Sequence, residues 1–152
     1  MDISTYFGIA EDAIRRYNLK PEDCKGEAPG VWYLGRGPAL ARIFMWTEEK
    51  SQVPYVRIAC PVMYVASEHQ NYDLLVRLLE LNAYYIGIKF VKSDNDIILG
   101  VDREMIGLDS GEMFAMVNRV LNIGAEQIPL LKEQFAVDNE HIKMYENNAQ
   151  PA

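Results

Sequence analysis

The sequence has very few of the residues that build metal and redox sites. Its 152 residues include only two cysteines and two histidines. The histidines, His69 and His141, lie far apart, whereas a zinc ion needs three or four nitrogen, sulfur or oxygen ligands close together. Cys24 and Cys60 lack the number and spacing of a disulfide scaffold and are interpreted as reduced thiols. We therefore expect no metal ion and no cofactor.

Clustered basic charge and long apolar runs are also absent. The net charge is −7 at pH 7 and the fifteen basic residues are scattered, whereas binding to a phosphate backbone needs clustered Lys and Arg. No apolar run reaches the roughly 18 residues of a membrane span. The first residues carry acids before bases, the reverse of a secretory signal. We predict a cytoplasmic protein that binds neither nucleic acid nor membrane.

No arrangement of residues typical of an active site is present. Gly35 and Gly37 separate two predicted strands, whereas phosphate-binding glycines lead into a helix. Asp94 and Asp96 resemble part of a calcium loop but lack its glycine and its final glutamate, so a hairpin turn is the better interpretation. A small hydrolase or transferase that uses Cys60 as nucleophile is the least favoured alternative, because no nucleophile elbow surrounds this thiol. The sequence predicts a protein that is not an enzyme.

Hydrophobic spacing predicts eight elements in the order α-β-β-β-α-β-β-α. Helices are expected over 3–17, 67–81 and 109–135, and strands over 31–35, 40–48, 55–66, 84–91 and 96–102. Hairpin connections dominate, so we predict a single α+β domain over residues 1–137, with an antiparallel sheet and helices mainly on one side. Residues 138–152 are predicted to form a polar C-terminal tail.

Three short signals predict where regular hydrogen bonding starts or breaks. Ser67 with Gln70, and Asp109 with Glu112, have the spacing of a capping box at a helix start. Pro61 lies inside the third predicted strand and has no N–H to donate to a ladder. It therefore predicts an edge position or a bulge.

Apolar and aromatic side chains are more numerous than one core face needs. Segments 31–35 and 40–48 carry bulky side chains at alternate and intervening positions alike. Some of these side chains should face outward unless another surface covers them. The leucines of the second predicted helix form a stripe wider than a core-facing helix usually has. We favour a dimer interface for this helix over complete burial inside one domain.

The stretch from Leu74 to Asp102 carries a resemblance to a known family. "LLVRLLELN" is followed by "IGIKF", a short acidic turn and "DIILGVD", and then by a long helix that begins "SGEMFAMVNRVL". This order resembles the YbjN-like proteins, which are also described as bacterial sensory transduction regulators and share the fold of type III secretion chaperones. The resemblance covers the order of elements from about Val31 to Phe135.

The resemblance implies a type III secretion chaperone-like fold and a non-enzymatic, chaperone-like or regulatory homodimer that binds an unidentified protein partner. In secretion chaperones the second helix and a neighbouring strand form the dimer interface. By position, this implies an interface made of Leu74, Leu75, Leu78, Leu79, Tyr84, Ile86 and Ile88. The partner would run in extended form over apolar patches at Trp32, Leu34, Phe44 and Trp46. Partners of secretion chaperones sometimes also add a strand to the edge of the sheet.

A small-ligand or signal sensor is the alternative function. The aromatic residues of the predicted strands would then line a pocket for a metabolite instead of a groove for a polypeptide. A bound metabolite would perturb Trp32 or Trp46 directly, which distinguishes this function from protein binding.

Overall fold

A computed structural model describes residues 2–65, 72–135 and 150–152. The strands are β1 (Val31–Arg36), β2 (Ala39–Thr47), β3 (Pro54–Tyr64), β4 (Lys89–Ser93), β5 (Asp96–Glu104) and β6 (Gln150–Pro151). The helices are α1 (Phe7–Arg15), α2 (Tyr72–Tyr84) and α3 (Ser110–Phe135), with short 3-10 turns η1 (Ile3–Tyr6) and η2 (Pro21–Cys24). The predicted order of helices and strands is confirmed, and β6 is added at its end.

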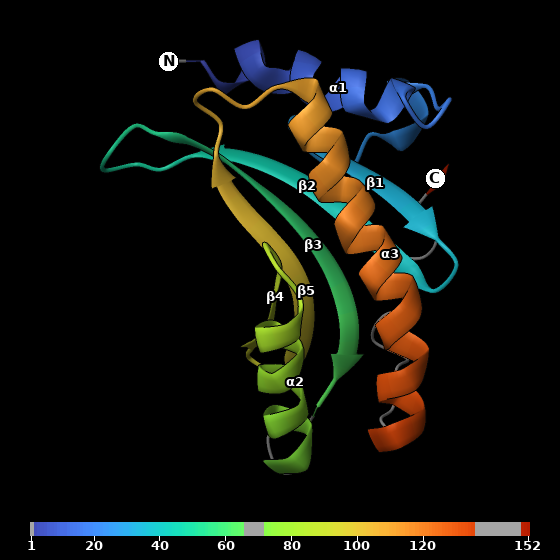
Figure 1. Cartoon of the computed structure of the whole chain (residues 1–152). Coiled ribbons are helices and arrows are strands. Elements are labelled where there is room, and N and C mark those ends of the chain that lie inside the picture. The colour runs from blue at the N-terminus through green and yellow to red at the C-terminus, as the bar shows by residue number, and fades with distance from the viewer. Residues whose placement is uncertain (1, 66–71, 136–149) are drawn as a thin grey trace.

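One sheet contains all six strands in the order β4-β5-β3-β2-β1-β6 (Figure 1). The five longer strands pair antiparallel, as predicted, whereas β6 runs parallel to β1. The register between β3 and β5 shifts between Pro61 and Met63, so the break predicted at Pro61 is a bulge. Asp94 adopts a φ of 51° in the β4–β5 turn, a conformation that aspartate tolerates better than most residues.

The helices lie on one face of the sheet, and this face carries the core (Figure 1). α3 packs across β1, β2, β3 and β5, α2 packs on β4, and α1 packs on α3. Alternate strand residues point into this layer, because successive side chains of a strand face opposite sides. The largest fully buried side chains are Ile14, Trp32, Leu34, Ile43, Ile58, Met63, Leu74, Ile97, Leu99, Met105, Met113 and Leu121. The predicted α+β architecture is therefore confirmed.

The capping box predicted at Asp109 forms at the start of α3. The Glu112 N–H donates to Asp109 Oδ1 at 2.8 Å, and the Asp109 N–H donates to Glu112 Oε2 at 3.3 Å. These two bonds satisfy backbone donors that the first turn of a helix leaves unpaired. The box predicted at Ser67 and Gln70 lies outside the described residues, as does most of the predicted tail, residues 138–149.

The opposite face of the sheet, here called the outer face, is covered at its β1 end by the segment that precedes this strand. The segment before β1 folds back over it, and the Gly26 N–H donates to the Val31 carbonyl at 2.9 Å. A Cβ at Gly26 would lie 2.5 Å from Val31 Cγ1, so glycine is needed for this close approach. Val31, Tyr33 and Leu40 are consequently buried in a small second cluster, with Phe44 packed against it.

Candidate interaction surfaces

Helix α2 is apolar on the side that faces the sheet and on the side that faces away. Leu74, Leu78 and Leu81 are buried in the core. Tyr72, Leu75 and Leu79 follow each other at steps of three and four residues and therefore share a stripe on the opposite side. The exposed fractions of these three side chains are 77%, 37% and 68%. A helix that is apolar on both sides normally has both sides covered.

The exposed stripe continues into the turn after α2. Tyr84 and Ile86 are 77% and 88% exposed, and the Tyr84 ring packs edge-on against Tyr85 with centroids 5.0 Å apart. We define the α2 patch as the exposed apolar residues of the helix and this turn: Tyr72, Leu75, Leu79, Tyr84 and Ile86.

The seven residues predicted for a dimer interface thus divide into two groups. Leu75, Leu79, Tyr84 and Ile86 belong to the α2 patch, whereas Leu74, Leu78 and Ile88 are buried in the core of the same chain. These three buried side chains pack α2 and the start of the following strand onto the core. Tyr72 was missed from the sequence, although its helical spacing from Leu75 and Leu79 is visible there.

The outer face carries a ladder of aromatic and guanidinium groups. The Phe44 and Trp46 rings stack with centroids 5.3 Å apart, and Trp46 stacks on Tyr55 at 5.6 Å. The Arg42 guanidinium lies 5.0 Å from the Phe44 centroid, and that of Arg57 lies 5.5 Å from the Trp46 centroid. These five side chains, here called the outer ladder, offer both apolar area and cation–π contacts. Arg57 is exposed, and the other four are half-buried.

Two residues predicted to contact a partner lie on the other side of the same strands. Trp32 and Leu34 are 1% and 0% exposed and pack in the core beneath the helices. A polypeptide cannot pack against these two side chains while the domain stays folded, so they are removed from the proposed contact surface. Phe44 and Trp46 keep their place in it.

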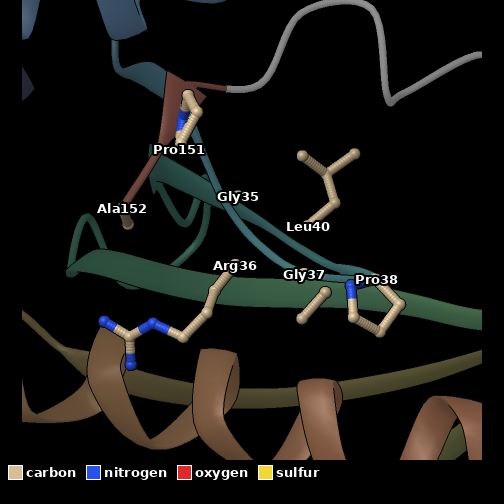
Figure 2. A pocket seen from close by; sticks show the side chains of 8 residues that line it. Gly35, Arg36, Gly37, Pro38, Leu40, Pro151 and Ala152 are labelled. Carbon is tan, nitrogen blue, oxygen red and sulfur yellow. The ribbon is translucent and has the colours of Figure 1, made fainter.

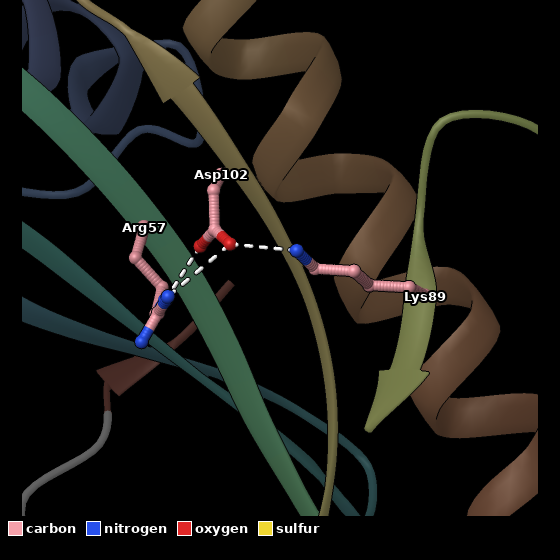
Figure 3. A network of polar contacts seen from close by, with 3 residues as sticks. All are labelled: Arg57, Lys89 and Asp102. Carbon is pink, nitrogen blue, oxygen red and sulfur yellow. Dashed lines mark hydrogen bonds and ion pairs between the residues drawn. The ribbon is translucent and has the colours of Figure 1, made fainter.

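A charged network extends the outer ladder toward β4 (Figure 3). Arg57 Nε and Nη2 donate to the two carboxylate oxygens of Asp102 at 2.5 and 3.2 Å, and Lys89 Nζ donates to Asp102 Oδ2 at 2.8 Å. Burial raises the pKa of Asp102, but the hydrogen bonds from Arg57 and Lys89 outweigh it and hold this pKa below its ordinary value of 3.8. One carboxylate thereby ties together β3, β4 and β5.

The Asp102 network makes stability depend on pH. A depressed carboxyl pKa stabilises the fold above the ordinary pKa, and this stabilisation is lost as the pH falls through the folded-state pKa. Asp102→Asn should lower the free energy of unfolding by about 1 kcal/mol near neutral pH, since the pairs are partly exposed. Urea titrations should show this difference shrinking as the pH falls below the ordinary pKa of 3.8 and through the lower folded-state pKa. Glu80→Gln, in an exposed pair with Arg77, is the control and should change stability by less than about 0.5 kcal/mol; an equal loss in both variants would contradict the assignment.

The two cysteine thiols are buried and are not in their nucleophilic form. Both are free and buried, and burial raises the pKa of the Cys60 thiol to about 12 and that of the Cys24 thiol to about 11. Both thiols are thus protonated near neutral pH, whereas the nucleophilic form is the thiolate. Within the described ranges, no cluster of three or more His, Cys, Asp or Glu side chains is arranged to hold a metal ion.

Two further hollows lie near β1. One, of about 310 Å³, is bounded by Phe7, Glu11 and residues 25–32, and another, of about 480 Å³, lies between the β1–β2 turn and residues Pro151 and Ala152 (Figure 2). Trp32 lines the first hollow, and its buried indole N–H has no hydrogen-bond partner in the described part of the chain. No described helix is both long and apolar enough to span a membrane.

Comparison with solved structures finds the same fold in two protein complexes. A chain of the heterodimeric complex ExoU–SpcU from the type III secretion system of Pseudomonas aeruginosa is similar over 80% of this chain and 95% of its own length, with 12% identity and a TM-score of 0.56. A chain of the ExsC–ExsE complex is similar over 86% of this chain and 97% of its own, with 13% identity and a TM-score of 0.59. The type III secretion chaperone-like fold predicted from the sequence is confirmed.

Sequence comparisons identify no family. No family model matches the chain, and no curated protein is similar to it. Membership of the YbjN-like family therefore stays a prediction. At 12% and 13% identity, the structural similarity shows the fold alone. A function has to be argued from the surfaces of this chain.

Proposed function

We propose that this protein is a non-enzymatic, chaperone-like homodimer of YbjN-like type that binds a polypeptide partner in the cytoplasm. The observation that carries the proposal is the α2 patch, an apolar surface on the side of α2 that faces away from its own core. A lone domain gains nothing by exposing such a stripe, whereas a second chain would remove it from water. That both structurally similar chains come from two-protein complexes supports a protein partner.

The two surfaces have different roles in this proposal. The α2 patch is a row of aliphatic and tyrosine side chains on one rigid helix, and it suits a symmetric contact with the same helix of a second copy. The outer ladder combines three half-buried rings with the guanidinium groups of Arg42 and Arg57. Aromatic and arginine side chains dominate binding energy in many protein interfaces. We assign the ladder to the partner.

Removing the rings of the outer ladder should weaken partner binding without loss of the dimer. We expect Phe44→Ala/Trp46→Ala to bind the partner at least about tenfold more weakly, because aromatic anchors commonly contribute 2 kcal/mol or more. The partner would first be identified by co-purification with the wild type, and its affinity for purified wild type and variant then measured by calorimetry.

Leu130→Ala is the matched control, because Leu130 is an exposed apolar residue of α3 outside both surfaces. It should bind the partner as the wild type does. Equal weakening by both changes, or none by Phe44→Ala/Trp46→Ala, would remove the ladder from the proposal.

A small-ligand sensor is the second candidate, and the hollow of about 310 Å³ beside Trp32 favours it. The indole N–H of Trp32, which has no partner among the described residues, would donate a hydrogen bond to an acceptor atom of the ligand. A metabolite that binds there should change tryptophan fluorescence, and Trp32→Phe should abolish its binding in calorimetry, because phenylalanine lacks the N–H. Unchanged binding by Trp32→Phe would place the ligand elsewhere.

A further inference from the structure

The edge of β1 is already occupied by a piece of the chain's own end. Leu34 and Gly35 pair in parallel with Gln150 and Pro151, and the Ala152 N–H donates to the Gly35 carbonyl at 2.5 Å. Residues 136–149 separate this short strand from α3 in the sequence. Pro151 and Ala152 also form one side of the hollow next to the β1–β2 turn, as Figure 2 shows.

The end of β1 that pairs with β6 is fixed in place by contacts with α3. Arg36, the last residue of β1, reaches from the strand toward α3 (Figure 2). Its guanidinium donates to the Asn118 side chain at 2.8 Å and to that of Asn122. The strand that receives β6 is therefore fixed in position before anything pairs with it, which lowers the entropy lost on strand addition.

Pro151 suits its place opposite Gly35. In a parallel pair, a residue whose N–H and C=O both point at the neighbouring strand does not bond to the residue directly opposite. It bonds to the residues just before and just after that one. The bond from Ala152 to Gly35 therefore directs the nitrogen of Pro151 away from β1, where the missing N–H does no harm. Pro151 also has no N–H to donate on the side of β6 that faces away from β1. A further strand therefore cannot bond to the sheet at this position.

The hold of β6 is nevertheless small. It covers two positions of a six-residue strand, and short pairings contribute little stability on their own. Connection to the same chain supplies a high effective concentration, which favours this pairing over a free competitor of equal strength. A partner segment that pairs over more positions would displace it.

We propose that the chain's own Gln150–Ala152 blocks the edge of β1 at Leu34 and Gly35, and that an extended partner segment pairs with this edge only by displacing it. The segment runs parallel to β1, with proline or another residue that needs no inward N–H opposite Gly35, followed by a residue whose N–H binds the Gly35 carbonyl. This inference rests on the proposed polypeptide-binding function and gives it a self-blocked edge in addition to the outer ladder.

A single substitution removes the bond that defines the pairing. Ala152→Pro deletes the N–H donor to Gly35, whereas Ala152→Gly keeps it and serves as the control. The amide of Arg36 shares a peptide plane with the Gly35 carbonyl, so its ¹⁵N–¹H NMR signal reports on this hydrogen bond. We expect the signal to shift in Ala152→Pro and to stay at the wild-type position in Ala152→Gly.

A peptide probe then tests docking in trans. The probe is an acetylated, amidated peptide with the sequence of residues 147–152, and its control carries N-methylalanine at the last position and so lacks the required N–H. At millimolar concentration the probe should return the Arg36 signal of Ala152→Pro toward the wild-type position, and the control peptide should not. Wild-type protein should respond much less to the probe, because its edge is occupied.

Three results would overturn the inference. An unshifted Arg36 signal in Ala152→Pro would mean that residues 150–152 do not hold the edge. A shifted signal that the probe leaves unchanged would mean that the edge is no docking site, and an equal response to both peptides would mean that the backbone bond plays no part. None of these readouts depends on the dimer or on the natural partner, so the inference fails separately from the proposed function.

Discussion

Replacing Leu79 with glutamate is expected to separate the dimer into monomers while each copy stays folded. Leu79 is 68% exposed in the single chain, so the change should alter the free energy of unfolding of the monomer by no more than about 0.5 kcal/mol. In the dimer it would place an unpaired charge from each copy in an apolar interface. We expect the dissociation constant to rise at least about 100-fold, equal to about 2.7 kcal/mol, as measured by analytical ultracentrifugation.

Leu130→Glu provides the control for this experiment. Leu130 is 51% exposed on α3 and lies outside the α2 patch, so it adds the same charge at a place where no interface is proposed. This variant should dimerise as the wild type does. Equal dissociation of both variants would indicate a general effect of charge, and a fully dimeric Leu79→Glu would exclude the α2 patch as the interface.

The neighbouring change Leu78→Glu should instead destroy the fold. Leu78 is 5% exposed and lies in the core between α2 and the sheet, so a glutamate there loses apolar packing and buries a carboxyl group. Removing a buried leucine side chain alone costs about 2–5 kcal/mol, and desolvating the polar group adds to this loss. That sum approaches the whole stability of many domains.

Circular dichroism and urea titration would measure this second effect. We expect Leu78→Glu to lose the cooperative unfolding transition or to show it at much lower urea, with helix content reduced. Leu78→Met, which nearly conserves volume, should cost less than about 1.5 kcal/mol and serves as the control. If Leu78→Glu were as stable as the wild type, the placement of the buried side of α2 would be wrong.

The contrast between Leu78 and Leu79 shows what the sequence was able to predict about the proposed dimer surface. The spacing of the leucines located the helix and its excess of apolar residues, and the structure confirms both. Which leucines face the domain's own core depends on where the sheet lies relative to the helix. That position is set by tertiary packing on β4, which the helical period does not encode.

The sequence did not show which aromatic residues of β1 and β2 face outward, and the reason is different. In β2, Ile43 and Met45 point to the core while Phe44 and Trp46 point outward, a normal alternation. β1 is buried on both faces, because the segment at Gly26 covers its outer face. Bulky residues therefore occur at the first four positions of β1, residues 31–34, and Trp32 was indistinguishable from an outward-facing tryptophan.

The short strand β6 was beyond prediction because it carries no hydrophobic pattern. Gln150 and Pro151 belong to a polar, proline-containing end that reads as a tail. Their pairing with β1 rests on backbone groups, which every residue has, and not on side-chain periodicity. By contrast, the break at Pro61 and the capping box at Asp109 depend on specific side chains. Of the two alternatives predicted at Pro61, the bulge is confirmed and the edge position is wrong, and the capping box is confirmed.

The mass of the wild-type protein in solution tests the central claim most directly. We expect a second copy to cover the apolar stripe on the side of α2 that faces away from the sheet. Light scattering coupled to size exclusion should therefore give about twice the chain mass of 17.4 kDa at micromolar concentration. A mass of 17.4 kDa at every concentration up to the highest soluble one would contradict the account.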